Sequence, residues 1–123
     1  MPARYRDKLG SEFFLTIAPG DRCLLLYTAA SWHSVEQKLR DVANKDDAHW
    51  EFVRTLTAPM LELEFDAQGR ILLPAGHRAR VGIERDVVLL GAISRLELWA
   101  KERVPRLTPS SNDVERAAQL GLD

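Results

Sequence analysis

Two periods of hydrophobic residues alternate along the chain, and together they predict both strands and helices. In residues 61–65 apolar side chains alternate with glutamates, which is the two-residue period of a strand with one buried face. Short apolar runs bounded by turn residues predict four more strands, at residues 13–17, 23–27, 87–90 and 96–99. The predicted strands therefore fall into two groups, one toward each end of the chain.

The segment between these groups carries the spacing of amphipathic helices. The apolar positions of the first predicted helix are Trp32, Val35, Leu39 and Val42. Thr28 or Ser31 is expected to cap it, because a hydroxyl there accepts a free backbone N–H. A second helix is predicted over residues 46–56 with Asn44 as its cap. Its inward-facing residues are expected to be Phe52, Val53 and Leu56. Strands and helices together predict the α+β class.

The sequence repeats itself with one offset and no gap. Pro2 corresponds to Pro74, which sets the offset at 72 residues. Further matching pairs are Ala3 with Ala75, Arg6 with Arg78, Gly10 with Gly82, Leu24 with Leu96, Leu26 with Leu98 and Tyr27 with Trp99. A duplicated unit predicts two similar halves that pack against each other, because neither half alone can bury its apolar face.

The second unit begins with a predicted β-hairpin. Residues 60–65 and 70–74 are its expected strands, and Gly69 is expected to take the left-handed conformation that closes the turn. Counting back by the offset places the partner of Leu73 at Met1, so the first unit lacks the counterpart of residues 60–72. We interpret this difference as a truncated or wrongly assigned start. A hairpin gained by the second unit is the alternative.

Composition and charge narrow the function classes. The 123 residues are 46% hydrophobic and 28% charged, as expected of one compact globular domain, and no run of about 18 apolar residues predicts a membrane span. The first eight residues lack the apolar core of a secretion signal, and the single Cys23 cannot form an internal disulfide, so a cytoplasmic location is expected. With a net charge of -1, any nucleic-acid site must be a local basic patch.

The sequence predicts neither catalysis nor a cofactor. It has no Gly-x-Ser-x-Gly motif and no phosphate-binding glycine loop, and we expect no small-molecule substrate. His33, His49 and His77 share no ligand spacing, so no metal site is expected. The three tryptophans could stack on bases, but their spacing with other apolar residues favours core packing for Trp32, Trp50 and Trp99.

Residues 63–74, Leu-Glu-Phe-Asp-Ala-Gln-Gly-Arg-Ile-Leu-Leu-Pro, resemble the Asp-x-x-Gly-Arg-x-x-x-Pro signature that MraZ proteins carry twice. The resemblance covers residues 2–104 and includes residues 23–27, 87–91 and 96–103. It implies a pseudo-duplicated, swapped-hairpin β-barrel of the AbrB type with two helices between the repeats. It also implies a cytoplasmic, nucleoid-associated transcriptional regulator that binds double-stranded DNA as a ring-like homo-oligomer. Its expected sites are direct repeats upstream of division and cell-wall genes.

The resemblance assigns DNA contacts to the Gly-Arg loop. Arg70 is the leading contact, because a guanidinium can donate two hydrogen bonds to a guanine edge or to a phosphate. The other expected contacts are Gly69, Gln68, Arg78, Arg4 and Arg6, while Asp66 and Pro74 are expected to hold the turn. A surface charge beside a turn is the alternative for Arg70. For the arginines that follow the hairpin motif, Arg80 and Arg85 included, the alternative is pairing with Asp7, Glu84 or Asp86.

We expect four segments: a truncated first repeat at 1–27, a two-helix connection at 28–57, a complete second repeat at 58–104 and a flexible tail at 105–123. The tail holds a short predicted helix at 113–120 but shows no clear amphipathic binding pattern. Two alternatives to the regulator stay open. One is an oligomerising AbrB-like module with impaired DNA binding, and the other is an antitoxin, which would need a toxin-binding tail.

Overall fold

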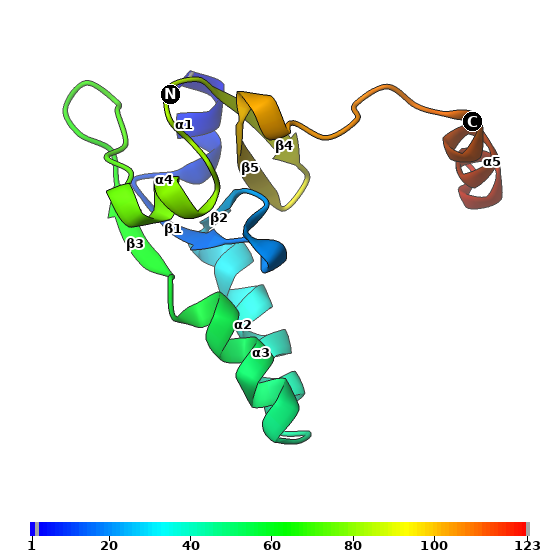
Figure 1. Ribbon diagram of the computed structural model, residues 1–123, viewed down its shortest axis with the longest axis horizontal. Helices are drawn as coiled ribbons and strands as arrows, with labels where there is room; N and C mark the ends of the chain where they lie inside the picture. The colour runs from blue at the N-terminus through cyan, green and yellow to red at the C-terminus, as the bar shows by residue number, and fades with distance from the viewer. Residues whose placement is uncertain (2, 123) are drawn as a thin grey trace.

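A computed structural model describes residue 1 and residues 3–122; Pro2 and Asp123 lie outside the described residues. One antiparallel sheet in the order β3-β1-β2-β5-β4 forms the centre of the protein (Figure 1). Its strands are β1 (Glu12–Ile17), β2 (Leu24–Thr28), β3 (Leu61–Glu64), β4 (Val87–Ala92) and β5 (Arg95–Ala100). The helices are α1 (Ala3–Leu9), α2 (Ala29–Ala43), α3 (Asp47–Thr57), α4 (Ala75–Arg80) and α5 (Ser111–Leu120), with short 3-10 turns η1 (Pro19–Asp21) and η2 (Lys101–Arg103). The predicted α+β class is confirmed.

The sheet is open, with β3 and β4 as its edges. A single chain therefore does not close the barrel that the resemblance implies, and the barrel stays a prediction. None of the described helices combines the length and the apolar character needed to cross a membrane.

The 72-residue repeat reappears in the backbone. Each unit runs helix, strand, strand, as α1-β1-β2 and then α4-β4-β5. The two units meet where β2 pairs with β5, and there Leu24 lies opposite Leu98 while Leu26 lies opposite Leu96. Leu24 and Leu26 are the repeat equivalents of Leu96 and Leu98. The two pairs are therefore related to each other by a local two-fold rotation. The local two-fold axis passes through the central pair, Leu25 and Glu97.

The helical connection forms as predicted in outline and differs in its caps. Thr28 caps α2, because its Oγ1 accepts the backbone N–H of Ser31 at 3.0 Å. The expected Asn44 cap of α3 is wrong: Asn44 ends α2, and the Asp46 carboxylate caps α3 by accepting the backbone N–H of His49 at 2.9 Å. The expected inward position of Phe52 is also wrong, since it is 43% exposed. The buried residue of α3 is its neighbour Val53. Successive side chains on a helix point about 100° apart, so Phe52 points away from the core when Val53 points into it.

Both faces of the sheet are covered. Alternate residues of β2 point to opposite sides, so Leu24 and Leu26 join a cluster with Leu9 and Val81, while its odd-numbered residues join the opposite cluster. That second cluster contains Cys23, Leu25, Tyr27, Trp32, Leu39, Val53 and Trp99. Core positions are therefore confirmed for Trp32 and Trp99. The expectation is wrong for Trp50, which is 44% exposed.

The predicted hairpin differs most from the structure. Its first strand is β3, but β3 pairs with β1, with Phe13 opposite Leu63. Within the described residues, 70–74 form no strand. Ile71 and Leu73 instead pack against the core cluster, and Leu72 is exposed. The apolar return segment gains more by covering the sheet than by extending a two-stranded ribbon.

Candidate nucleic-acid interface

A bend at residues 66–70, which we call the 66–70 loop, stands out from one end of the molecule (Figure 1). The Asp66 carboxylate organises it from inside. Its Oδ1 accepts the backbone N–H groups of Gln68 at 2.9 Å and Arg70 at 2.8 Å. The backbone N–H of Gly69 donates to the Asp66 carbonyl at 3.0 Å. The hydrogen bond from the Arg70 backbone N–H lowers the pKa of Asp66 below its ordinary value, and the Arg70 side chain and the Gln68 N–H lower it further. The Asp66 carboxylate is therefore ionised at neutral pH.

Arg70 is held at the tip of this loop with its side chain 72% exposed. Its Nε donates to Asp66 Oδ2 at 3.0 Å, and its Nη2 donates to Gln68 Oε1 at 3.3 Å. An exposed ion pair of this kind contributes little to stability, so a phosphate or a base can share or replace the carboxylate at low cost. The guanidinium is thus oriented by the loop and open to a ligand.

Gly69 is the hinge of the loop, with φ 74° in the left-handed region. The Arg6 side chain, from α1, lies directly against it. A Cβ atom on residue 69 would stand 2.9 Å from Arg6 Cζ and closer still to Arg6 Nη1. The fold therefore brings together three of the expected contacts, Arg6, Gly69 and Arg70, although α1 and the loop are far apart in sequence.

The other two expected arginine contacts, Arg4 and Arg78, each have their own surroundings. Arg4 is exposed; its Nη2 donates to the Tyr5 hydroxyl at 2.9 Å, and its Cζ lies 4.6 Å from the centre of that ring. Arg78 on α4 is exposed and lines an open cleft of about 330 Å³ with Leu73. Pro74 precedes α4, and its carbonyl accepts the Arg78 backbone N–H at 3.1 Å.

Arg80 is paired with a residue that the sequence did not indicate. Its Nη2 lies 2.7 Å from Asp21 Oδ1, on the turn between β1 and β2, and the Asp21 carbonyl also accepts Arg103 Nη1 at 3.4 Å. The hydrogen bond from Arg80 lowers the pKa of Asp21 and raises the pKa of Arg80. Pairing of Arg80 with Glu84 or Asp86 was therefore the wrong alternative, because the fold places Asp21 of the other unit beside it.

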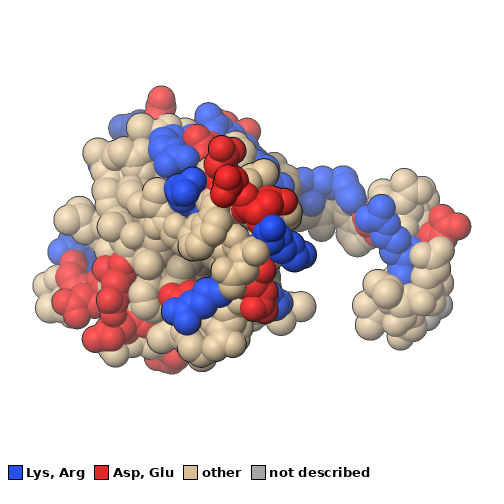
Figure 2. All heavy atoms as spheres, turned by 90° about the horizontal axis from the view of Figure 1, so that it is seen from below, with Lys and Arg blue, Asp and Glu red and all other residues tan. Residues whose placement is uncertain are grey.

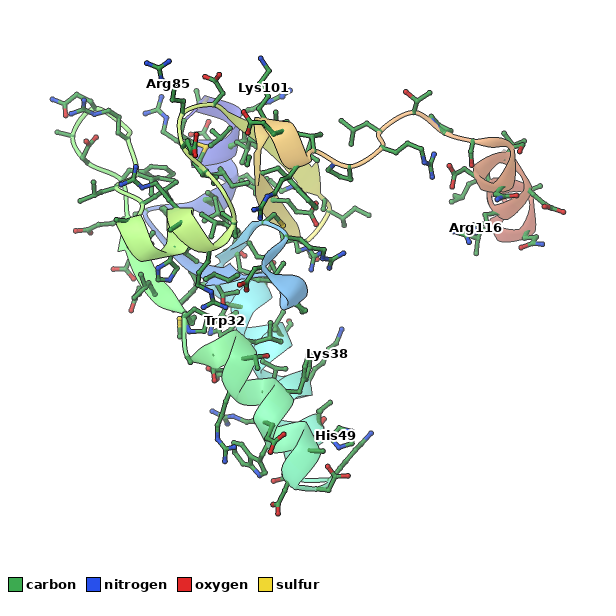
Figure 3. All side chains as sticks on the ribbon, viewed as in Figure 1. Trp32, Lys38, His49, Arg85, Lys101 and Arg116 are labelled. Carbon is green, nitrogen blue, oxygen red and sulfur yellow. The ribbon has the colours of Figure 1, made fainter. Side chains whose placement is uncertain are left out.

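Two further cations share the end of the molecule that bears the 66–70 loop. Figure 3 shows Arg85 and Lys101 pointing outward there, at the opposite end from His49 on α3. Lys101 was not among the expected contacts, and its only sequence signal is its place in the segment 96–103 that carries the resemblance. The opposite end, seen in Figure 2, mixes acidic and basic side chains, so it offers no continuous basic surface.

The histidines have local partners. His49 Nδ1 lies 2.6 Å from Asp46 Oδ1, and His77 Nε2 lies 2.7 Å from the Pro59 carbonyl oxygen. Across the described part of the chain, no three His, Cys, Asp or Glu residues gather as metal ligands would.

Comparison with known proteins adds independent information. A family model described as "MraZ protein, putative antitoxin-like" matches residues 57–119. A protein of Thermoanaerobacter sp. (strain X514) named "Transcriptional regulator MraZ" is 42% identical over 103 residues, covering 83% of this chain and 71% of that protein. Proteins of the same name are 38% identical in Symbiobacterium thermophilum and 35% identical in Acetivibrio thermocellus, each covering 99% of this chain, and 89% and 88% of those proteins respectively.

Proposed function

This chain belongs to the MraZ family, and we propose that it is a transcriptional regulator that binds double-stranded DNA through the 66–70 loop. The observation that carries the proposal is the exposed Arg70 guanidinium, held outward by a carboxylate and a glycine bend. Such an oriented, charged donor suits a base edge or a phosphate, because the loop directs it outward before binding.

In the proposed complex, Arg70 enters the major groove and donates to the O6 and N7 acceptors of a guanine. Asp66 keeps the Nε edge of the guanidinium oriented, so that the outer edge faces the DNA. The Gln68 amide lies beside it and can donate to a neighbouring acceptor. Arg4, Arg6 and Arg78 contact phosphates, which set position and affinity without reading sequence. Lys101 and Arg85 extend this set.

Several copies act together in this proposal. The net charge of -1 gives no long-range attraction to DNA, and a few phosphate contacts per chain bind weakly. A ring-like homo-oligomer presents the loop repeatedly, and a DNA with direct repeats then binds with high effective concentration. We propose such repeats upstream of division and cell-wall genes as the target, a cytoplasmic, nucleoid-associated location, and closure of the barrel between chains. The repeats 1–27 and 58–104 supply the sheet, with 28–57 as the helical connection and 105–123 as the tail.

The test replaces Arg70 with alanine and measures binding to a duplex that covers the region upstream of the gene encoding this chain. Loss of a two-bonded guanine contact is expected to weaken binding by about 10- to 100-fold, since such a contact contributes about 1–3 kcal/mol. Arg116→Ala, which removes an exposed arginine from α5, is the matched control and should bind normally. Unchanged retention of Arg70→Ala at low salt would remove the mechanism.

Two other functions make different predictions. An interaction module with impaired DNA binding would assemble but show equally weak, salt-sensitive binding to the upstream duplex and to a scrambled one. An antitoxin would need a partner-binding tail. The sequence-based expectation that the tail shows no clear amphipathic pattern is wrong, because α5 places Val114, Ala117 and Ala118 on one side and Gln119 on the other, with Leu120 at the edge of the apolar side.

A further inference from the structure

α5 is an amphipathic helix with nothing packed on its apolar face. Val114, Leu120 and Leu122 are 64%, 72% and 74% exposed, and none of the ten helical residues is buried. Figures 1 and 2 show the helix standing clear of the body on an extended segment. A helix this short is marginal in water by itself, and most of its stability must come from covering its apolar side.

The ends of α5 are nevertheless fully specified. Ser110 and Asp113 form a reciprocal capping box at the N-terminus, and Arg106 Nη1 donates to Asp113 Oδ2 at 2.7 Å, which fixes the preceding segment to the helix. At the C-terminus Gly121 takes φ 72°, and the Leu122 N–H donates to the Ala117 carbonyl at 2.8 Å. The Gly121 N–H also donates to the Ala118 carbonyl at 3.2 Å, and these two bonds fold Leu122 back onto the apolar side. α5 is thus a preformed arm that lacks a surface to pack on.

A matching surface lies between α2 and α3. An open apolar hollow of about 240 Å³ is lined by Trp32, Leu39, Ala43, Trp50, Val53 and Met60. Trp50 is 44% exposed at its edge although Trp32, deeper in the hollow, is buried. The volume suits a few aliphatic side chains, which is what one face of α5 offers.

Charge is complementary as well. Glu115 borders the apolar side of α5, three residues before Ala118, and the ion pair of Arg40 and Glu36 borders the hollow. Arg40 is paired with Glu36 at 3.2 Å, but its side chain is 74% exposed and can turn to a second carboxylate. The two surfaces therefore match in polarity at the edge and in apolar character at the centre.

We propose that α5 of one copy packs into the α2–α3 hollow of another copy. The helix is held to one side of its own body while the α2–α3 hairpin projects from a different side (Figure 1), so the exchange joins neighbouring chains. Such a contact is head-to-tail: each chain offers a helix to one neighbour and a hollow to another, and successive contacts close into a ring. The inference gives the proposed self-association a specific contact and does not depend on DNA binding.

Cross-linking between two differently tagged chains tests the contact directly. One chain carries Trp50→Cys and the other Leu120→Cys, and the mixed, refolded sample is treated with a short bismaleimide. The native Cys23 is a poor competitor, because it is buried and burial raises its pKa to about 11. We expect a cross-link between the two tagged chains. Phe52→Cys replaces Trp50→Cys as the control, since it has the same exposure on the same helix but does not line the hollow.

Three results would overturn the proposal: no cross-link between chains, equal cross-linking with Phe52→Cys, or a cross-link that forms only when both cysteines are in one chain.

The mass of the assembly in solution gives the second test. Val114→Asp is expected to reduce the mass below that of the full assembly, whereas Gln119→Asp on the polar side of α5 should not. If Val114→Asp keeps the full assembly, the α5 contact is wrong while self-association stands. Arg70→Ala should lose DNA but keep the cross-link, which separates this proposal from the DNA-binding one.

Discussion

The Arg6 guanidinium lies against the backbone of Gly69, so close that a Cβ atom there would stand 2.9 Å from Arg6 Cζ. Arg6 belongs to the first helix of the first unit, and Gly69 to the loop that opens the second. The contact ties the proposed DNA-binding loop of one unit to the helix of the other. Residue 69 must therefore be glycine for two reasons, its left-handed φ of 74° and the position of Arg6.

Gly69→Ala is expected to weaken binding to the upstream duplex by about tenfold or more, because alanine in the left-handed region costs about 1–2 kcal/mol and the loop must also move away from Arg6. The part of this loss that comes from the clash with Arg6 should disappear when Gly69→Ala is made in an Arg6→Ala background. Fluorescence anisotropy measures DNA binding by the original chain, the two single variants and the double variant, which together make a double-mutant cycle. Thermal unfolding checks that each protein is folded. An equal loss from Gly69→Ala in both backgrounds would mean that Arg6 does not constrain the loop.

Arg78 and Arg80 lie on the same short helix and should behave differently. Arg78→Ala is expected to reduce the slope of log binding constant against log salt by about one, as loss of one phosphate contact does. Arg80→Ala should leave that slope unchanged and lower the unfolding temperature only slightly, because Asp21 loses its partner but the pair is half exposed. Titrations at several salt concentrations measure both slopes. A similar decrease for Arg80→Ala would place Arg80 in the interface and contradict this assignment.

Local patterns predicted most of the fold. The central strands, the two-helix connection and the Thr28 cap depend on side chains near in sequence, which is where periodicity and capping rules apply. The partner of β3 could not be predicted in this way. Hairpin rules favoured residues 70–74, but β3 pairs with β1, and Ile71 and Leu73 pack against the core cluster on the sheet. Competition between a local and a distant partner is decided by packing that one strand's sequence does not contain.

The same limit applies to the candidate site. The turn at Asp66 was predictable, because the carboxylate bonds to N–H groups two and four residues ahead. The approach of Arg6 to Gly69 and the pairing of Arg80 with Asp21 join opposite units, so no local pattern indicates them. The exposure of Trp50 was missed because a helical stripe gives the direction of a side chain but not whether a neighbouring element covers it.

Thr16 is a buried polar group that anchors α3 to the sheet. Its Oγ1 donates to the Leu56 carbonyl at 2.6 Å, and the residue is 2% exposed. Thr16→Val keeps the shape but leaves the carbonyl without this donor, so we expect the free energy of unfolding in urea to fall by about 1–3 kcal/mol. Thr55→Val removes an equally short bond, to the Phe52 carbonyl, on the exposed side of α3 and should change it by less than about 0.5 kcal/mol. Equal effects would show that burial does not set the value of the bond.

The capping carboxylate of α5 predicts a pH dependence confined to that helix. Hydrogen bonds from Arg106, and then from the Ser110 backbone, lower the pKa of Asp113 from its ordinary 3.8 to about 2. A group with a lowered folded pKa stabilises the fold fully above its ordinary pKa and stops doing so as pH falls through the folded value. The α5 amide signals of Ala117 and Ala118 should therefore stay helical at pH 4 and change between about pH 4 and 2. Asp113→Asn, which does not titrate, should begin less helical and show no such step, whereas Glu115→Gln should keep it. A step that persists in Asp113→Asn would assign the titration to another carboxylate and would remove the capping box as the reason that the helix is preformed.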